Sequence, residues 1–198
     1  MDYKKGLKEK IDASYERRIK QWLASDPAHL ITLAEEIVAT RLVYDNLLHV
    51  ISDGGAVFLS QLDDPLEAVS SRWSRENGLG SVHNDELAHC VSSLRLEALD
   101  LSQQLTVREF IIQNPGDAFS LMTSSGFVDL TADQATDLLN GNCVVGDPGA
   151  SGFSRKVMAD ELLTQVVLSA NMDKGIWYLM TDHLEMSQDG PEMGVTMC

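Results

Sequence analysis

The chain has 198 residues, of which 44% are hydrophobic and 23% are charged. These values match ordinary globular proteins, so the composition excludes a wholly disordered chain. Thirty acidic residues against fifteen basic ones give a net charge of −15, so most of the surface is expected to repel nucleic acid and anionic lipid. No apolar run approaches the roughly 20 residues of a membrane helix, and we expect a cytoplasmic protein with no membrane partner.

The first 104 residues are predicted to form a five-helix bundle, because their apolar residues recur every three or four positions. Asp26-Pro27 and Asp64-Pro65 each supply an N-cap followed by a proline, which is typical of a helix start. The glycine pair Gly54-Gly55 indicates that the second helix stops there. The five predicted helices cover residues 2–24, 27–53, 56–62, 65–77 and 84–104.

Beyond residue 105 the apolar residues stand in short runs that are typical of strands, and glycines cluster. Two capping boxes, Thr106–Glu109 and Thr131–Gln134, each predict the start of a helix. Hairpins are predicted around Ser124-Ser125 and around residues 171–175. This half is therefore expected to be a small antiparallel sheet with one or two helices.

The predicted fold class is α+β, because a helical half precedes a half that mixes strands and helices. The tail has no hydrophobic period and is expected to be flexible. The predicted divisions are a helical bundle domain over 1–104, an α+β domain over 105–184 and a tail over 185–198.

No pattern in the sequence predicts an enzyme, a cofactor or a metal site. The segment His83–His89 offers at most three weak metal ligands, whereas structural zinc requires four. The glycine-rich segment Gly141–Gly152 lacks the Gly-Lys-Ser/Thr ending of a phosphate-binding loop. The three cysteines form no Cys-x-x-Cys pair, and we expect Cys90 and Cys143 to be packed and Cys198 to be exposed.

Acidic residues are the remaining candidates for a binding site. Asp129, Asp133 and Asp137 stand four apart, and the last two would share one face of a helix at about 6 Å. Such a row resembles a run of phosphates and would suit a basic protein surface. The alternative is that the acidic residues only keep the protein soluble. The candidate partner-binding residues are Asp129, Asp133, Asp137, Asp147, Asp160, Glu161, Asp63 and Glu67.

Packing and capping residues in the first hundred positions carry a family resemblance. They are residues 15–23, the stretch Leu33-Ala-Glu-Glu-Ile-Val, Asp64–Val69 with Trp73, and Asp85-Glu-Leu. These stretches resemble a family of short, uncharacterised helical proteins encoded on mobile elements of Gram-positive gut bacteria. The second half resembles accessory modules from similar elements. The family supplies no catalytic residues to carry over.

The resemblance implies a role in the contest between mobile DNA and its host, where small acidic proteins often block defence nucleases. A guide-RNA-directed nuclease has a positive channel and reads a short DNA motif with paired arginines, which carboxylates can occupy in place of DNA. The leading hypothesis is therefore an anti-CRISPR protein that blocks DNA binding or cleavage by DNA mimicry, without binding nucleic acid itself. The alternatives are a non-inhibitory regulatory module of a conjugative element and an enzyme with a deep pocket.

Overall fold

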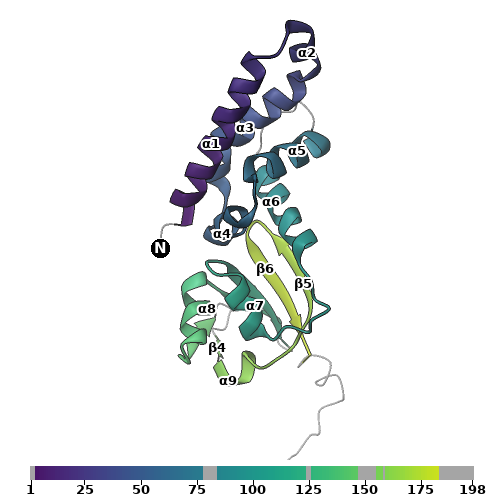
Figure 1. The fold of residues 1–198 in the computed structure, drawn as a ribbon. Coiled ribbons are helices and arrows are strands. Elements are labelled where there is room, and N and C mark those ends of the chain that lie inside the picture. The colour runs from purple at the N-terminus through teal and green to yellow at the C-terminus, as the bar shows by residue number, and fades with distance from the viewer. Residues whose placement is uncertain (1–2, 78–83, 124–125, 147–154, 158, 183–198) are drawn as a thin grey trace, which may run out of the picture. The chain divides into compact units, whose positions relative to one another are not determined.

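The structure is a computed structural model that describes residues 3–77, 84–123, 126–146, 155–157 and 159–182. It is an α+β protein, as predicted (Figure 1). Within the described residues, no helix combines the length and the hydrophobicity that crossing a membrane requires. The chain divides into two compact units. Unit 1 comprises residues 1–99, 114–117 and 172–176, and unit 2 comprises residues 100–113, 118–171 and 177–198.

Unit 1 is mainly helical, but the prediction of five helices is not confirmed. The second predicted helix is interrupted at Leu33, whose N–H caps the preceding helix by donating to the His29 carbonyl. The last predicted helix ends at Ala98 and does not reach residue 104. The helices are α1 (Tyr3–Leu23), α2 (Pro27–Thr32), α3 (Ala34–Val50), α4 (Asp53–Gln61), α5 (Pro65–Asn77) and α6 (Asn84–Ala98).

The glycine pair Gly54-Gly55 lies in the first turn of α4, so its interpretation as a helix stop is wrong. Ser52 is the N-cap of α4, and its Oγ accepts a hydrogen bond from the Gly55 N–H at 3.0 Å. A serine cap outweighs the low helix propensity of two glycines, because it satisfies an N–H group that the helix itself leaves unpaired. The two predicted Asp-Pro starts are both present, at Pro27 and Pro65.

The core of unit 1 follows the apolar period of its helices. Leu66, Val69 and Trp73 recur at three- and four-residue intervals on α5 and are fully buried. Leu7 and Ile11 on α1 belong to the same hydrophobic cluster. Burial of one such side chain stabilises the fold by roughly 1.5–3 kcal/mol, so this cluster accounts for much of the stability of unit 1.

Unit 2 combines a four-stranded sheet, in the order β2-β1-β6-β5, with a separate β3-β4 pair. The capping boxes begin α7 and α8 as predicted, since Thr106 and Thr131 each accept from an N–H three residues on. Strand β4 was not predicted from the sequence. The elements are α7 (Val107–Gln113), β1 (Ala118–Thr123), β2 (Gly126–Leu130), α8 (Ala132–Leu139), β3 (Val144–Gly146), β4 (Arg155–Val157), α9 (Ala159–Leu162), β5 (Val167–Asp173) and β6 (Ile176–Thr181).

The four-stranded sheet is mixed, which corrects the prediction of an antiparallel sheet. β1 and β2 are antiparallel, and β5 and β6 are joined by a tight turn in which Lys174 and Gly175 have positive φ. Because such a turn connects antiparallel strands, the parallel pair must be β1 and β6, which are adjacent in the strand order. Sequence patterns identify the hairpins but leave the pairing between them open.

One face of this sheet forms the core of unit 2. The Phe110 ring of α7 packs edge-on against Phe119 of β1 and Trp177 of β6, with centroid separations of 6.3 and 5.0 Å. Leu130 of β2 and Leu138 of α8 are also buried. The strands therefore alternate between residues under the helices and residues on the opposite face.

A buried ion pair joins α6 of unit 1 to the segment Asn114–Asp117. Arg95 Nη1 donates to Asp117 Oδ1 at 2.9 Å, and Arg95 Nη2 donates to Asp117 Oδ2 and, at 3.0 Å, to Asn114 Oδ1. Both charged side chains are almost completely buried. Gly54 makes room for the carboxylate, since a Cβ atom at that position would overlap it. The pair thus depends on a glycine that the sequence alone suggested was a stop signal.

We expect Asp117→Ala to destabilise the protein by about 3–5 kcal/mol, because it leaves the Arg95 guanidinium buried without its counter-charge. Urea unfolding followed by circular dichroism measures the change. Asp45→Ala is the control, since Asp45 pairs with Arg41 on the surface, with side chains 44% and 61% exposed. The control should lose far less stability. Equal losses of unfolding free energy in the two variants would show that the buried pair stabilises the protein no more than a surface pair.

Candidate functional site

Two of the predicted acidic residues share the exposed face of α8. Asp133 and Asp137 are both exposed, whereas Ala135 and Leu138 on the same helix are buried. The spacing of four residues places the two carboxylates about 6 Å apart. Neither carboxylate forms an ion pair within the described residues. They are therefore two adjacent negative charges that a partner could neutralise.

Asp129 does not share that helical face, because it lies on strand β2. Val128 and Leu130, its neighbours, are buried under the helices, so Asp129 points to the opposite face of the sheet. Its register partner is Ser120 on β1, whose Oγ donates a hydrogen bond to the carboxylate. The predicted row of three aspartates is thus divided between two faces of unit 2.

The structure does not describe the side chains of the other predicted acidic residues of unit 2. Asp147 lies outside the described residues. The backbone places Asp160 and Glu161 on α9, but their side chains are also outside the described part. Of the predicted residues of unit 2, Asp129, Asp133 and Asp137 are therefore the ones whose side chains the structure describes.

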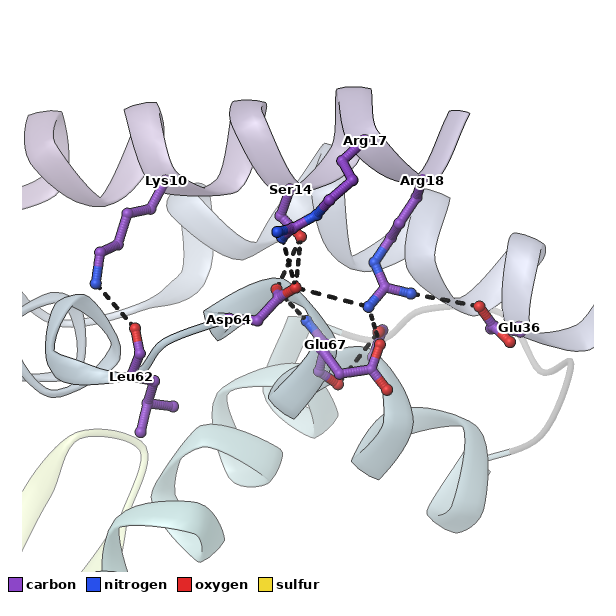
Figure 2. A network of polar contacts seen from close by, with 9 residues as sticks. Lys10, Ser14, Arg17, Arg18, Glu36, Leu62, Asp64 and Glu67 are labelled. Carbon is purple, nitrogen blue, oxygen red and sulfur yellow. Dashed lines mark hydrogen bonds and ion pairs between the residues drawn. The ribbon is translucent and has the colours of Figure 1, made fainter. Parts of the chain in front are cut away.

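The two candidates of unit 1 differ from each other. Asp63 is exposed, whereas Glu67 is held in a network of polar contacts between α1, α3 and α5 (Figure 2). Arg18 of α1 is at the centre of this network, with only 12% of its side chain exposed. It binds Glu67 and also Glu36, at 3.3 Å. Glu67 is therefore already neutralised, which argues against a role in binding a partner.

Asp64, the N-cap of α5, ties α1 to the start of that helix. It accepts from the Glu67 N–H at 3.0 Å and from Ser14 Oγ at 2.8 Å. Arg17 adds an ion pair to the same carboxylate at 3.0 Å. One aspartate thus satisfies a helix start and anchors a second helix, and the sequence predicted only the first of these roles.

The basic residues of α1 are largely engaged by unit 1 itself. Lys10 donates to the Leu62 carbonyl at 2.9 Å (Figure 2) and to the Ser60 carbonyl at 2.7 Å, at the end of α4. Lys8 pairs with Asp12 at 2.6 Å. The basic helix is therefore packed against carboxylates and helix-end carbonyls, which weakens any reading of it as a nucleic-acid-binding surface.

The charges of the two units are compensated unequally. Unit 2 has twelve acidic and three basic residues, whereas unit 1 has eighteen acidic and twelve basic ones. The ion pairs found among the described residues lie in unit 1. Because a carboxylate without a nearby base keeps its full negative field, unit 2 is the part of the chain best suited to attract a cation.

Metal and substrate sites find little support in the described part of the chain. It contains no group of three or more acidic, histidine or cysteine side chains placed to hold a metal. Asp85, one of the possible ligands, pairs with Lys174 at 2.8 Å. A hollow lined by Ser92, Arg95 and Met172, among others, has a volume of about 20 Å³, which is room for one water. A larger hollow of about 510 Å³ lies along α1 and is open to solvent, whereas ligand sites bury most of their ligand. It is lined by Ala13, Glu16, Arg17, Lys20, Gln21 and Ala24.

The sequence matches no protein-family model, no curated protein and no solved structure. The functional argument therefore rests on the residues and their geometry.

Sequence reasoning missed the exposed aromatic residues near Asp129. Phe127 is 44% exposed on β2, on the same face as Asp129, and its ring contacts Tyr178 of β6 at a centroid distance of 6.2 Å. The sequence Gly126-Phe-Val-Asp-Leu130 could have predicted this arrangement. Phe127 and Asp129 stand two residues apart, and residues at that spacing lie on the same face of a strand.

Arg17 and Arg18, adjacent on α1, provide a matched test of the network in Figure 2. We expect Arg18→Ala to destabilise the protein by about 1–3 kcal/mol, because its largely buried guanidinium joins carboxylates from α3 and α5. Arg17, with 60% of its side chain exposed, should lose much less stability when replaced by alanine. Thermal unfolding of both variants makes the comparison, and an equal effect would mean that the network contributes little.

The two described cysteines should react differently with iodoacetamide. Burial raises the pKa of the Cys90 thiol to about 12, with a further contribution from its hydrogen bond to Glu76, whereas Cys143 is exposed, contrary to the prediction. Because the thiolate is the nucleophile, Cys90 should stay unmodified in the native protein at pH 8 and react after denaturation. Peptide mass mapping distinguishes the two sites.

The raised pKa of Cys90 also predicts that the protein loses stability at alkaline pH. The folded protein holds this proton more tightly than the unfolded chain, so the contribution to stability is complete below pH 9 and is lost as the pH rises toward 12. Cys90→Ala should reduce this alkaline loss. Rapid modification of Cys90 at pH 8 would contradict both expectations.

Proposed function

We propose that this protein is an acidic, protein-binding inhibitor encoded by a mobile element, and specifically an anti-CRISPR protein that binds a guide-RNA-directed nuclease. The uncompensated carboxylates of unit 2 are the observation that carries this proposal. Asp133 and Asp137 stand exposed on α8 without ion pairs in the described residues, while the bases of the chain are concentrated in unit 1. The protein acts by binding and has no catalytic role.

The inhibition follows from competition for basic groups. A guide-RNA-directed nuclease must keep arginines and lysines unpaired in its DNA channel, since these groups bind phosphates and read the short recognition motif. A carboxylate can take the place of a phosphate, because a guanidinium binds either group through two parallel hydrogen bonds. Two carboxylates about 6 Å apart on one helix face offer such a channel two adjacent negative charges in place of phosphates.

The preorganisation of α8 is important for this competition. Its N-terminus is fixed by the reciprocal Thr131–Gln134 hydrogen bonds at 2.8 and 3.2 Å, and Gln134 also donates to the Val145 carbonyl of β3. Because the helix backbone that carries the aspartates is already ordered, binding a cationic partner costs little additional backbone ordering. A flexible acidic segment of equal charge would bind more weakly.

An inhibition assay tests the proposal. Purified protein is titrated into guide-loaded nucleases from a panel of effector classes, and both target binding and target cleavage are measured. We expect inhibition of at least one effector at near-stoichiometric concentrations, with an apparent affinity that falls as salt is raised from 50 to 200 mM, as for an electrostatic competitor. Full cleavage by every effector at excess protein would refute the anti-CRISPR assignment.

Two double variants, one in each unit, test whether the α8 carboxylates are responsible for the inhibition. Asp133→Asn combined with Asp137→Asn should weaken inhibition about tenfold, at about 0.7 kcal/mol for each lost contact. Glu9→Gln combined with Glu16→Gln is the control, because it removes the same charge from exposed positions of α1 in unit 1. A non-inhibitory conjugation module would instead bind a relaxase or replication protein and leave every nuclease active.

A further inference from the structure

The four-stranded sheet has an open face on the side opposite its helices. Along β6 the side chains of Trp177, Leu179 and Thr181 are buried, so Tyr178 and Met180 between them point to the other face. Both are only partly buried. The same alternation places Phe127 on the open face of β2, since its neighbour Val128 is buried.

This open face is unusually apolar for a surface in contact with water. Met122 is 40% exposed, Phe127 44% and Leu168 38%, and they come from three strands of one sheet. Met122 and Phe127 are register partners on β1 and β2. Contiguous exposed apolar residues on a rigid sheet, as opposed to single scattered ones, are characteristic of interaction surfaces.

A carboxylate adjoins the two aromatic rings on this face. Phe127 and Tyr178 meet edge to face, with their ring planes at 82°. Asp129 stands two residues from Phe127 on the same strand and is exposed. Ser120, buried beneath, holds the Asp129 carboxylate by a hydrogen bond from its hydroxyl. The carboxylate is thus fixed beside an aromatic surface.

We infer that this face, formed by Met122, Phe127, Asp129, Leu168, Tyr178 and Met180, docks a protein segment that presents an arginine flanked by apolar side chains. This inference rests on the proposed function and identifies the surface that holds the basic partner. The arginine stacks on Phe127 or Tyr178 and pairs with Asp129, while apolar groups of the partner cover Met122 and Leu168.

The chemistry of the face selects arginine over other cations. A guanidinium is planar and weakly hydrated, so it can stack on an aromatic ring while its N–H groups bind a carboxylate. A lysine ammonium makes the second contact but stacks poorly. Nucleic acid is disfavoured, because a fixed carboxylate within an acidic unit repels phosphates. A second copy of this acidic unit is disfavoured for the same reason.

The docking surface and the α8 carboxylates have separate tasks. Exposed charges such as Asp133 and Asp137 act at a distance and accelerate the encounter with a basic partner, whereas buried aromatic and arginine contacts slow its release. The open face therefore determines the lifetime of the complex.

A peptide-binding experiment tests this surface without assuming which nuclease is the partner. The probe is a 12-residue synthetic peptide in which arginine alternates with leucine, and its lysine analogue is the comparison. Binding to the full chain is measured at 0.15 M salt by fluorescence anisotropy, and the contact residues by backbone amide shifts. We expect the arginine peptide to bind at least fivefold more tightly than the lysine peptide and to shift amides of β1, β2 and β6.

Three variants and one control make the test specific. Phe127→Ala should weaken binding about tenfold, and Asp129→Asn about fivefold, with loss of the preference for arginine. Met122→Lys, at another exposed position, should abolish binding by like-charge repulsion, which keeps the test decisive if Phe127→Ala is poorly folded. Asp100→Asn is the matched control, because it removes one exposed aspartate of unit 2 that belongs neither to this face nor to α8, and it should leave affinity within twofold.

The possible outcomes separate this inference from the proposed function. Unchanged affinity in Phe127→Ala and Asp129→Asn, or amide shifts confined to unit 1, would overturn the docking surface even if the wild-type protein inhibits a nuclease. If the variants lose the peptide but no nuclease is inhibited, the docking surface stands and the anti-CRISPR assignment falls. A dimer of the full chain that Phe127→Ala dissociates would assign the face to a second copy and also overturn the inference.

Discussion

The carboxylates of this protein outnumber its basic side chains two to one, and the position of the few bases determines which parts of the chain are held together by ion pairs. Fifteen bases cannot neutralise thirty acids, and twelve of them lie in unit 1, where Arg18 and Arg95 hold helices and loop segments together through carboxylates. Unit 2 carries the larger share of the deficit, nine charges against six in unit 1, and its helices and sheet are held by apolar packing and capping boxes. The concentration of bases in unit 1 lets ion pairs hold that unit together, and the scarcity of bases in unit 2 is the basis of the proposed binding to a basic protein.

The two proposals use different physical properties of unit 2. Exposed aspartates on α8 supply a field that extends over about one Debye length, some 8 Å at physiological salt. The open sheet face supplies short-range contacts, in which aromatic rings and one oriented carboxylate meet the partner directly. A partner that satisfied only the charges would bind and leave quickly, whereas one that also fits the rings would remain bound.

Sequence features that depend on neighbouring residues predicted much of the fold. Contacts between residues far apart in the sequence could not be predicted in this way. The Asp-Pro starts, both capping boxes and both hairpins could be read from the sequence because each depends on residues a few positions apart. The glycines of α4 were misread, since their role is to admit Asp117, 63 residues away. The mixed sheet and the Arg18 network were missed for the same reason. In the candidate site, the spacing of Asp133 and Asp137 was readable, but the placement of Asp129 on a strand separated it from them.

Unit 1 is assembled from three separate segments of the chain, and this affects how it folds during synthesis. Its helices are complete by residue 98, yet it also contains residues 114–117 and 172–176, and Lys174 reaches Asp85 across 89 positions. During translation the Arg95 guanidinium must therefore wait for Asp117 to leave the ribosome, and the last segment arrives only when nearly all of unit 2 has been made. Such late contacts slow folding and prolong the time in which a nascent chain depends on chaperones. A gene cut near codon 104 would encode a helical fragment without the counter-charge for its own buried arginine.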